Sequence, residues 1–336
     1  MPPRKEKRLH RTIEITTPPS YTDELVDELG KLDGVISLSV VRGASLKPEG
    51  DVLTVHALNR GADEVLRLAE AASEHGRVSV STGELSSLVD PEHQQAVAED
   101  VDEALWEEVE TGLRHQSRTT ANYLILMALG GAIAATGFVV HSTEQAISFM
   151  AAAIVAPGFD ALAKTSVGLT LRRWGVATRG LGSAALGYLV LALSAALVLV
   201  VLRLTGVTTV GEFAHNHAVK SLAHPALRGV LLSACGALAG MVMLTSYRRY
   251  LLPGALIALL IIESAALVGA SLAAGEPDLA LGALGRFVIS AALVVAAGML
   301  VMGLKQILVH RRKPMVMGSR GRVRRLRGSG PNAPGS

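Results

Sequence analysis

The chain has 336 residues, and half of them are apolar, mainly Ala, Leu and Val rather than aromatic residues. Its 34 glycines add to a composition typical of closely packed membrane helices, in which small residues let backbones approach one another. A single cysteine excludes an internal disulfide, and the net charge of +3 conceals an acid-rich stretch at 90–110 and a basic C-terminal end.

Residues 9–88 predict a small cytosolic domain, preceded by disordered residues 1–8 that lack an apolar signal region. Four segments have strand character, two carry one apolar helix face, and the order β-α-β-β-α-β is that of the ferredoxin-like α+β fold. No residue declares a ligand, and we interpret His56 and His75 as ordinary surface residues because no metal-ligand spacing surrounds them. The predicted strands are 9–16, 34–42, 51–58 and 77–85, and the predicted helices are 23–32 and 62–76.

Residues 89–120 predict an amphipathic linker helix between this domain and the membrane. Valine or leucine recurs at every fourth position with acidic residues between, which gives the helix one apolar stripe. The stripe must pack on something, and two interpretations remain: it lines an oligomer axis, or the helix is a plain linker. The apolar positions are Val97, Val101, Leu105, Val109 and Leu113, with Trp106 beside them.

The segment 121–305 predicts an α-helical polytopic transmembrane domain with about six spans, since six apolar segments reach the roughly 20 residues that a spanning helix needs. Arginine and lysine occupy alternate loops, so by the positive-inside rule both termini face the cytoplasm of a multi-pass protein in the cell (inner or plasma) membrane. Small-residue faces such as Gly236 and Gly240, together with the amphipathic helix, predict a homo-oligomer. The predicted spans are 121–141, 146–171, 180–204, 226–247, 251–274 and 279–304.

Residues 306–336 predict a basic, disordered tail. We expect its arginines to lie on anionic cytoplasmic lipid, where each charge near the surface contributes roughly 1 kcal/mol. We expect no nucleic-acid partner, because no aromatic platform for stacking bases accompanies these charges.

The second span contains a helix break at Pro157 and Gly158 and two charges, Asp160 and Lys164. Proline frees backbone carbonyls that must find partners in lipid, and each charge at that depth costs at least ~2.5 kcal/mol unless it pairs or meets water. Two interpretations remain. One is a pathway for a small ion or polar solute, as at the broken helices of transporters. The other is a kink with a self-neutralising Asp160–Lys164 pair one turn apart. We favour the pathway.

Two further charges lie well inside spans, Glu263 near the centre of 251–274 and Arg286 in 279–304. They lie roughly 15 and 10 Å from the outer ends of their spans, so their side chains can meet between antiparallel neighbours. Together with Ser264 they predict a gate or ion site, and the alternative is a structural intramembrane salt bridge.

The outer loop between the third and fourth spans holds His215, His217 and His224. The spacing is a weak indication of a divalent metal site, and solvated or pH-sensing histidines are the rival interpretation, so we expect no metal and no cofactor. The sequence contains no nucleophile elbow, phosphate loop, zinc-protease helix or dinucleotide fingerprint, so we expect no enzyme.

Residues 122–304 resemble the domain of unknown function 389 family of hydrophobic bacterial and archaeal membrane proteins. The family's asparagine-led first span is matched by NYLILMALGGAIAATGFVV, and its Gly-Ala-Met-x-x-Ser/Ala-Pro motif is echoed by AAAIVAP at 151–157. Its Leu-Pro-Gly start with an Ala-Leu run is matched by LPGALIAL at 252–259. The resemblance implies a polytopic helical membrane fold, but the family name implies no activity.

The chain departs from the family pattern at or next to each singled-out charge. Glu263-Ser264 stand where the family has Pro-Pro. Asp160 and Ala161 stand where it has Gly and Pro, and Arg286 replaces an apolar residue. The signatures therefore suggest a shared cavity that is charged in this chain. We expect a channel or transporter for a small ion or polar solute with a cytosolic regulatory domain; the alternative is a non-transporting, membrane-anchored sensor or scaffold oligomer.

Overall fold

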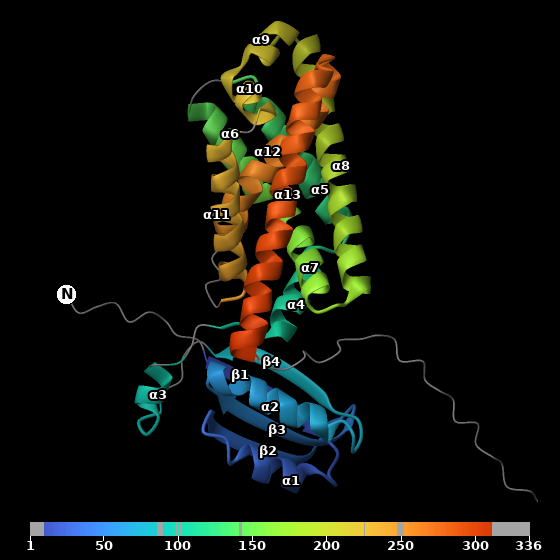
Figure 1. Cartoon of the computed structure of the whole chain (residues 1–336). Helices are drawn as coiled ribbons and strands as arrows, with labels where there is room; N and C mark the ends of the chain where they lie inside the picture. Colours follow the sequence, from blue (N-terminus) through green and yellow to red (C-terminus); the bar gives the residue numbers. More distant parts are fainter. Residues whose placement is uncertain are drawn as a thin grey trace, which may run out of the picture.

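The structure, a computed structural model, has two parts: a four-stranded sheet that carries two helices, and a bundle of longer helices (Figure 1). The predicted disordered segment 1–8 and all of the tail beyond residue 310 lie outside the described residues. The described residues are 10–85, 90–98, 100, 103–140, 143–224, 226–246 and 252–310.

The N-terminal part has the element order that its sequence predicts, β-α-β-β-α-β. All strand pairs are antiparallel, and the order β2-β3-β1-β4 places β1 in the interior and β4 at an edge. Alternate apolar residues of β1 and β3 form a buried core with the apolar faces of the two helices. The elements are β1 His10–Thr17, α1 Thr22–Leu29, β2 Val35–Leu46, β3 Glu49–Ala57, α2 Asn59–Ala72 and β4 Ser79–Leu85.

Asp51 of β3 forms hydrogen bonds with α1 and with strand β2. Its carboxylate accepts hydrogen bonds from the Gly43 backbone N–H and from the Thr22 hydroxyl, both at 2.7 Å. These two donors, with Arg42 nearby, hold the pKa of Asp51 below its usual value. The carboxylate form is therefore the one that the fold stabilises.

We expect acid to loosen this domain, and we expect Asp51→Asn to weaken that pH dependence. A carboxyl with a lowered folded-state pKa stabilises the fold above its unfolded pKa of about 3.9, and the contribution is lost as the pH falls through the lowered value. Hydrogen exchange of the β3 amides between about pH 5 and pH 2 measures this loss. The control is Asp23→Asn, since Asp23 is highly exposed. Identical acid profiles for wild type and Asp51→Asn would contradict the assignment.

The predicted linker, 89–120, contains two helices instead of one: α3 Gln94–Ala98 and α4 Trp106–Gln116. Tertiary contacts interrupt the helical repeat between them. The Asp100 carboxylate accepts a hydrogen bond from the Asn59 N–H at the start of α2, at 2.6 Å. The Ala104 N–H donates to a backbone carbonyl of the bundle rather than to a helical one. Local preference for one helix is overridden by these long-range bonds.

The apolar stripe of the linker is shared between the two parts of the protein. Leu105 packs in the core of the sheet, whereas Trp106, Val109 and Leu113 pack in the core of the bundle. All four side chains are at least 97% buried. The linker is therefore a junction that belongs to both cores.

The bundle follows the predicted apolar segments. The segment predicted as the second span is two helices, separated at Pro157, and the third begins six residues before its predicted start. The elements are α5 Ala121–Gly137, α6 Thr143–Val155, α7 Gly158–Thr170, α8 Trp174–Leu204, α9 Val210–His215, α10 His217–Ala223, α11 Leu227–Leu244, α12 Leu252–Ala274, α13 Pro277–Lys305 and a π-helical turn at Gln306–His310.

The helices α8, α11 and α13 are each long and apolar enough to cross a membrane. Two bent pairs raise the number of candidate spans among the described residues to five: α4 with α5, bent by 73°, and α6 with α7, bent by 50°. Leucines and valines are exposed along the outside of α8 and α13, where lipid can cover them. These apolar helices indicate a membrane protein.

The two ends of the bundle differ. The short helices α9 and α10 cap the end opposite the sheet, here called the distal end (Figure 1). The turn between α7 and α8, which holds Arg172 and Arg173, and the C-terminal end of α13 lie at the sheet end (Figure 1). The basic turn at Arg172 and Arg173 thus lies on the side of the N-terminal domain.

Ion pairs fasten the sheet to the bundle through α4. Arg11 of β1 is fully buried and pairs with Glu108, and its Nη2 donates to the Glu103 backbone oxygen at 3.3 Å. Glu103 in turn pairs with Lys305 at the end of α13, at 2.5 Å. Two residues after Glu108 in α4, Glu110 pairs with Arg173 before α8. Ion pairs and a hydrogen bond thereby join the sheet to α4, and α4 with the residues before it to α8 and α13.

Candidate functional site

The break in the second predicted span forms a polar interruption between two apolar half-helices. Pro157 has no N–H, and the Gly158 N–H donates to the Ala156 oxygen at 2.9 Å. Among the described residues no side chain caps the N-terminus of α7, so its first turn presents backbone N–H groups close to the last carbonyls of α6. The predicted fracture is therefore present, and it offers both hydrogen-bond donors and acceptors.

Asp160 lies in the first turn of α7, where the helix dipole favours a carboxylate. Among the described residues it has no ion pair within 4.0 Å, so the self-neutralising pair with Lys164 is not present. Lys164 is 8% exposed and lines a cavity of about 30 Å³ together with Glu110, Arg114 and Arg179. Asp160 and Lys164 therefore lie in different surroundings, Asp160 at the helix break and Lys164 at the cavity.

Tyr188 of α8 completes the surroundings of the break, and no sequence motif points to it. Its side chain is 5% exposed, and its hydroxyl has no hydrogen-bond partner in the described part of the chain. A Cβ at Gly158 would lie 2.5 Å from the hydroxyl oxygen, so only glycine admits this approach. The ring of Tyr188 also packs against Phe287 of α13, with centroids 4.8 Å apart. Tyr188 therefore bridges the break and α13.

A second tyrosine lies on the neighbouring helix α5. The Tyr123 hydroxyl is buried and donates to the Ser183 backbone oxygen of α8 at 3.0 Å. The sequence held one signal for both tyrosines: the chain has only five, and these two stand inside apolar spans.

Glu263 of α12 and Arg286 of α13 are both buried, 6% and 5% exposed. They lie close enough to attract one another, but no side-chain nitrogen–oxygen distance of 4.0 Å or less joins them. The Arg286 guanidinium rests against Gly229 of α11, and its Nε has no partner among the described residues. Ser264 donates to the Ile261 backbone oxygen at 3.0 Å. The structure brings the two charges near each other without a direct salt bridge.

Helix lengths place these groups at successive depths. At 1.5 Å per residue, Glu263 and Arg286 lie about 15 Å from the distal ends of α12 and α13. Asp160 follows the 13-residue helix α6 and therefore lies about 20 Å or more from that end. Lys164 lies one turn further toward the sheet. The charges thus occur in the order Glu263 and Arg286, Asp160, Lys164 across the bundle.

Buried polar atoms that lack a hydrogen-bond partner among the described residues occur in the helices that carry these charges or contact them. Proteins normally satisfy such groups, so each one calls for a reason. A visiting ion, water or polar solute is one such reason, because it would supply the absent hydrogen bonds. In the described part of helices α7, α8, α12 and α13 these atoms are Thr170 Oγ1, Tyr188 Oη, Arg286 Nε and Ser271 Oγ.

The three histidines of the distal loop do not converge. Ring nitrogens of His215 and His224 lie 2.8 and 3.2 Å from backbone oxygens four residues earlier, Gly211 and Lys220. His217 begins α10. Within the described residues no group of three or more His, Cys, Asp or Glu side chains is placed to hold a metal ion.

Comparison with known proteins identifies one family. A family model described as "Domain of unknown function (DUF389)" matches residues 153–296, which include the break, Asp160, Glu263 and Arg286. The match confirms the resemblance seen in the sequence motifs, and it starts after the asparagine-led first span. No curated protein and no solved structure matches the chain.

Proposed function

We propose, from the geometry of residues 153–296, which match the DUF389 family model, that the protein is an integral membrane channel or transporter for a small ion or polar solute. The proposed pathway runs past Glu263, Arg286 and the α6–α7 break to Lys164. The observation that carries the proposal is Asp160, a carboxylate at a mid-bundle helix break with no ion-pair partner among the described residues. An unpaired carboxylate at such depth is costly unless something polar visits it.

The small size of the described cavity beside Lys164 supports the interpretation that this structure is a closed state of the pathway. Its volume of about 30 Å³ admits a single water molecule but no larger solute. Its walls come from α4, α7 and the start of α8, so a shift of α4 would change its size. Because Leu105, the residue just before α4, packs in the core of the sheet, we propose that the cytosolic domain regulates the pathway through this helix.

We propose six spans, with α12 as the fifth, because α12 has 23 residues and contacts α6, α7, α8 and α13. We propose that the N-terminal domain is ferredoxin-like, which the strand order supports. The basic turn before α8 and Lys305 lie on the side of this domain, and by the positive-inside rule this side and both termini face the cytoplasm of the cell (inner or plasma) membrane.

Flux through proteoliposomes tests the proposal. Purified protein is reconstituted, and the release of monovalent cations, protons, small anions and neutral polar solutes is compared with that from protein-free vesicles. We expect release of one class above the background. Background release for all classes, both with and without a membrane potential, would contradict a transport function.

The alternative is a membrane-anchored sensor or scaffold that assembles as a homo-oligomer and carries nothing. The outward faces of α8 support assembly, since open space surrounds Gly175 and Gly182, where a second helix could approach closely. Assembly by itself is compatible with transport, so flux decides between the two.

A further inference from the structure

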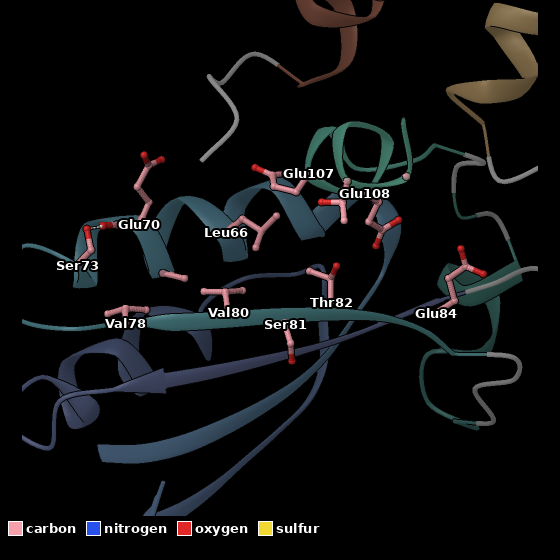
Figure 2. Close-up of a pocket in the computed structure, with 13 residues that line it drawn as sticks. Leu66, Glu70, Ser73, Val78, Val80, Ser81, Thr82, Glu84, Glu107 and Glu108 are labelled. Atoms are coloured by element: carbon pink, nitrogen blue, oxygen red, sulfur yellow. Dashed lines mark hydrogen bonds between the residues drawn. The ribbon is translucent and has the colours of Figure 1, made fainter. Parts of the chain in front are cut away.

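A pocket of about 830 Å³ lies on the helical face of the sheet, beside β4 (Figure 2). Strand β4 forms its floor, α2 forms a wall and the first turns of α4 close it. In the part of the chain that the structure describes, α1 and α2 cover the four-stranded sheet, which leaves the face of the edge strand β4 partly open.

The lining of this pocket combines an apolar floor with an acidic rim. Val80 projects from β4 toward Leu66 of α2, and Val78 lies just before the strand, while Glu70 stands at the rim (Figure 2). Glu107, which is 5% exposed, belongs to the α4 side of the lining. Glu84 and Glu108 also belong to the lining, and Glu108 is paired with Arg11. None of the thirteen lining residues is a lysine or an arginine. The pocket therefore suits a ligand that is cationic and also apolar.

We propose that the C-terminal segment 322–327 of this same chain, RVRRLR, docks in the pocket. The segment carries four arginines, which can each bind a carboxylate through two parallel hydrogen bonds. Val323 and Leu326 stand between them and match the apolar floor. The whole segment 311–336 has eight basic residues and no acidic one, so its charge is opposite to that of the rim.

The end of α13 contacts the chain that leads into α4, the helix that closes the pocket. Lys305 pairs with Glu103, three residues before α4, and the helix ends at His310. The eleven residues from 311 to 321 can span up to about 36 Å, which exceeds the length of any helix of the sheet domain. The segment can therefore reach the pocket within one molecule.

Docking would give the junction a way to sense the membrane surface. The same arginines are attracted to anionic lipid at roughly 1 kcal/mol per charge. The pocket and the lipid thus compete for segment 322–327. When the segment binds in the pocket, its arginines lie against the wall that α4 forms; when it binds to lipid, they do not. This inference does not depend on whether the bundle transports anything.

Crosslinking of the full-length protein tests the docking. In a Cys235→Ser background, Thr82→Cys in the pocket is combined with Ser329→Cys in the tail and treated with a short bismaleimide. Thr82 points toward the pocket in Figure 2. The matched control replaces Thr82→Cys by Ser39→Cys on the opposite edge strand, β2. After correction for the reactivity of each cysteine, we expect the pocket pair to react at least about tenfold faster, because docking raises the effective concentration.

Two further arms separate the causes. Glu70→Gln with Glu84→Gln, or 1 M salt, should lower the rate of the pocket pair toward that of the control, since charge attraction is screened beyond about 3 Å at that salt. The rate advantage should persist in bilayers that contain phosphatidylglycerol. Equal rates for the two pairs, no effect of removing the carboxylates, or loss of the advantage in anionic bilayers would each overturn the proposal, the last by assigning the tail to lipid.

Discussion

Replacing Asp160 by asparagine is expected to reduce flux at least about tenfold and to leave the protein no less stable than the wild type. The two effects have one cause. The carboxylate is held in the bundle without an ion-pair partner among the described residues, so neutralising it removes a desolvation cost. It also removes the charge that a visiting ion or polar solute would meet. Flux in proteoliposomes and the thermal midpoint in detergent measure the two effects separately.

The matched control for this prediction is Glu144→Gln, which removes an exposed carboxylate from the distal end of the same broken span. Asp160→Glu should retain part of the flux because it keeps the charge. Glu263→Gln is a second test of the same path. If Asp160→Asn lowers the thermal midpoint and leaves flux at the level of the control, Asp160 has a structural role, and unchanged flux in both variants removes the proposed site.

Replacing Arg11 by methionine is expected to destabilise the junction by about 3–5 kcal/mol, because it leaves a largely buried carboxylate, Glu108, without its main cationic partner. The same change removes the hydrogen bonds from Arg11 to the Asn59 side chain and to the Glu103 backbone oxygen. Methionine has a similar length and no charge, so packing is largely kept.

Trp106 fluorescence during denaturant unfolding reads out the junction, because this indole is 2% exposed at the start of α4. Trp174→Phe removes the other tryptophan of the chain. The control is Arg67→Met, which breaks an exposed pair with Glu64 that contributes less than about 1 kcal/mol. The double variant Arg11→Met, Glu108→Met should recover part of the loss, since no buried charge remains. A midpoint for Arg11→Met equal to that of Arg67→Met would contradict the assigned role.

Local patterns in the sequence were sufficient for the elements and for the break. Alternation and β-branching predict the four strands, and the missing N–H of Pro157 predicts the end of α6. Both preferences depend only on neighbouring residues in the sequence, so distant contacts do not change them here. The charged residues of the spans were likewise visible as departures from an apolar background.

The partners of those residues could not be predicted, because they depend on contacts between distant segments. A one-turn spacing suggests that Asp160 meets Lys164, yet the lysine lines a cavity with α4 and the start of α8. Tyr188 matters only because α8 places it against Gly158, 30 residues away in sequence. The repeat in the linker predicts one helix, which the bond between Asp100 and α2 interrupts.

The unequal halves of the broken span have an electrical consequence. With 13 residues, α6 measures about 20 Å, roughly two thirds of a 30 Å hydrocarbon layer. A monovalent ion that reaches Asp160 from the sheet side then crosses about one third of the transmembrane voltage, and from the distal side about two thirds. At 2.3 kcal/mol per charge and 100 mV, the voltage changes the free energy of occupancy by about 0.8 kcal/mol for entry from the sheet side and by about 1.5 kcal/mol, with the opposite sign, for entry from the distal side. The position of one proline thereby sets how strongly voltage biases occupancy from each face.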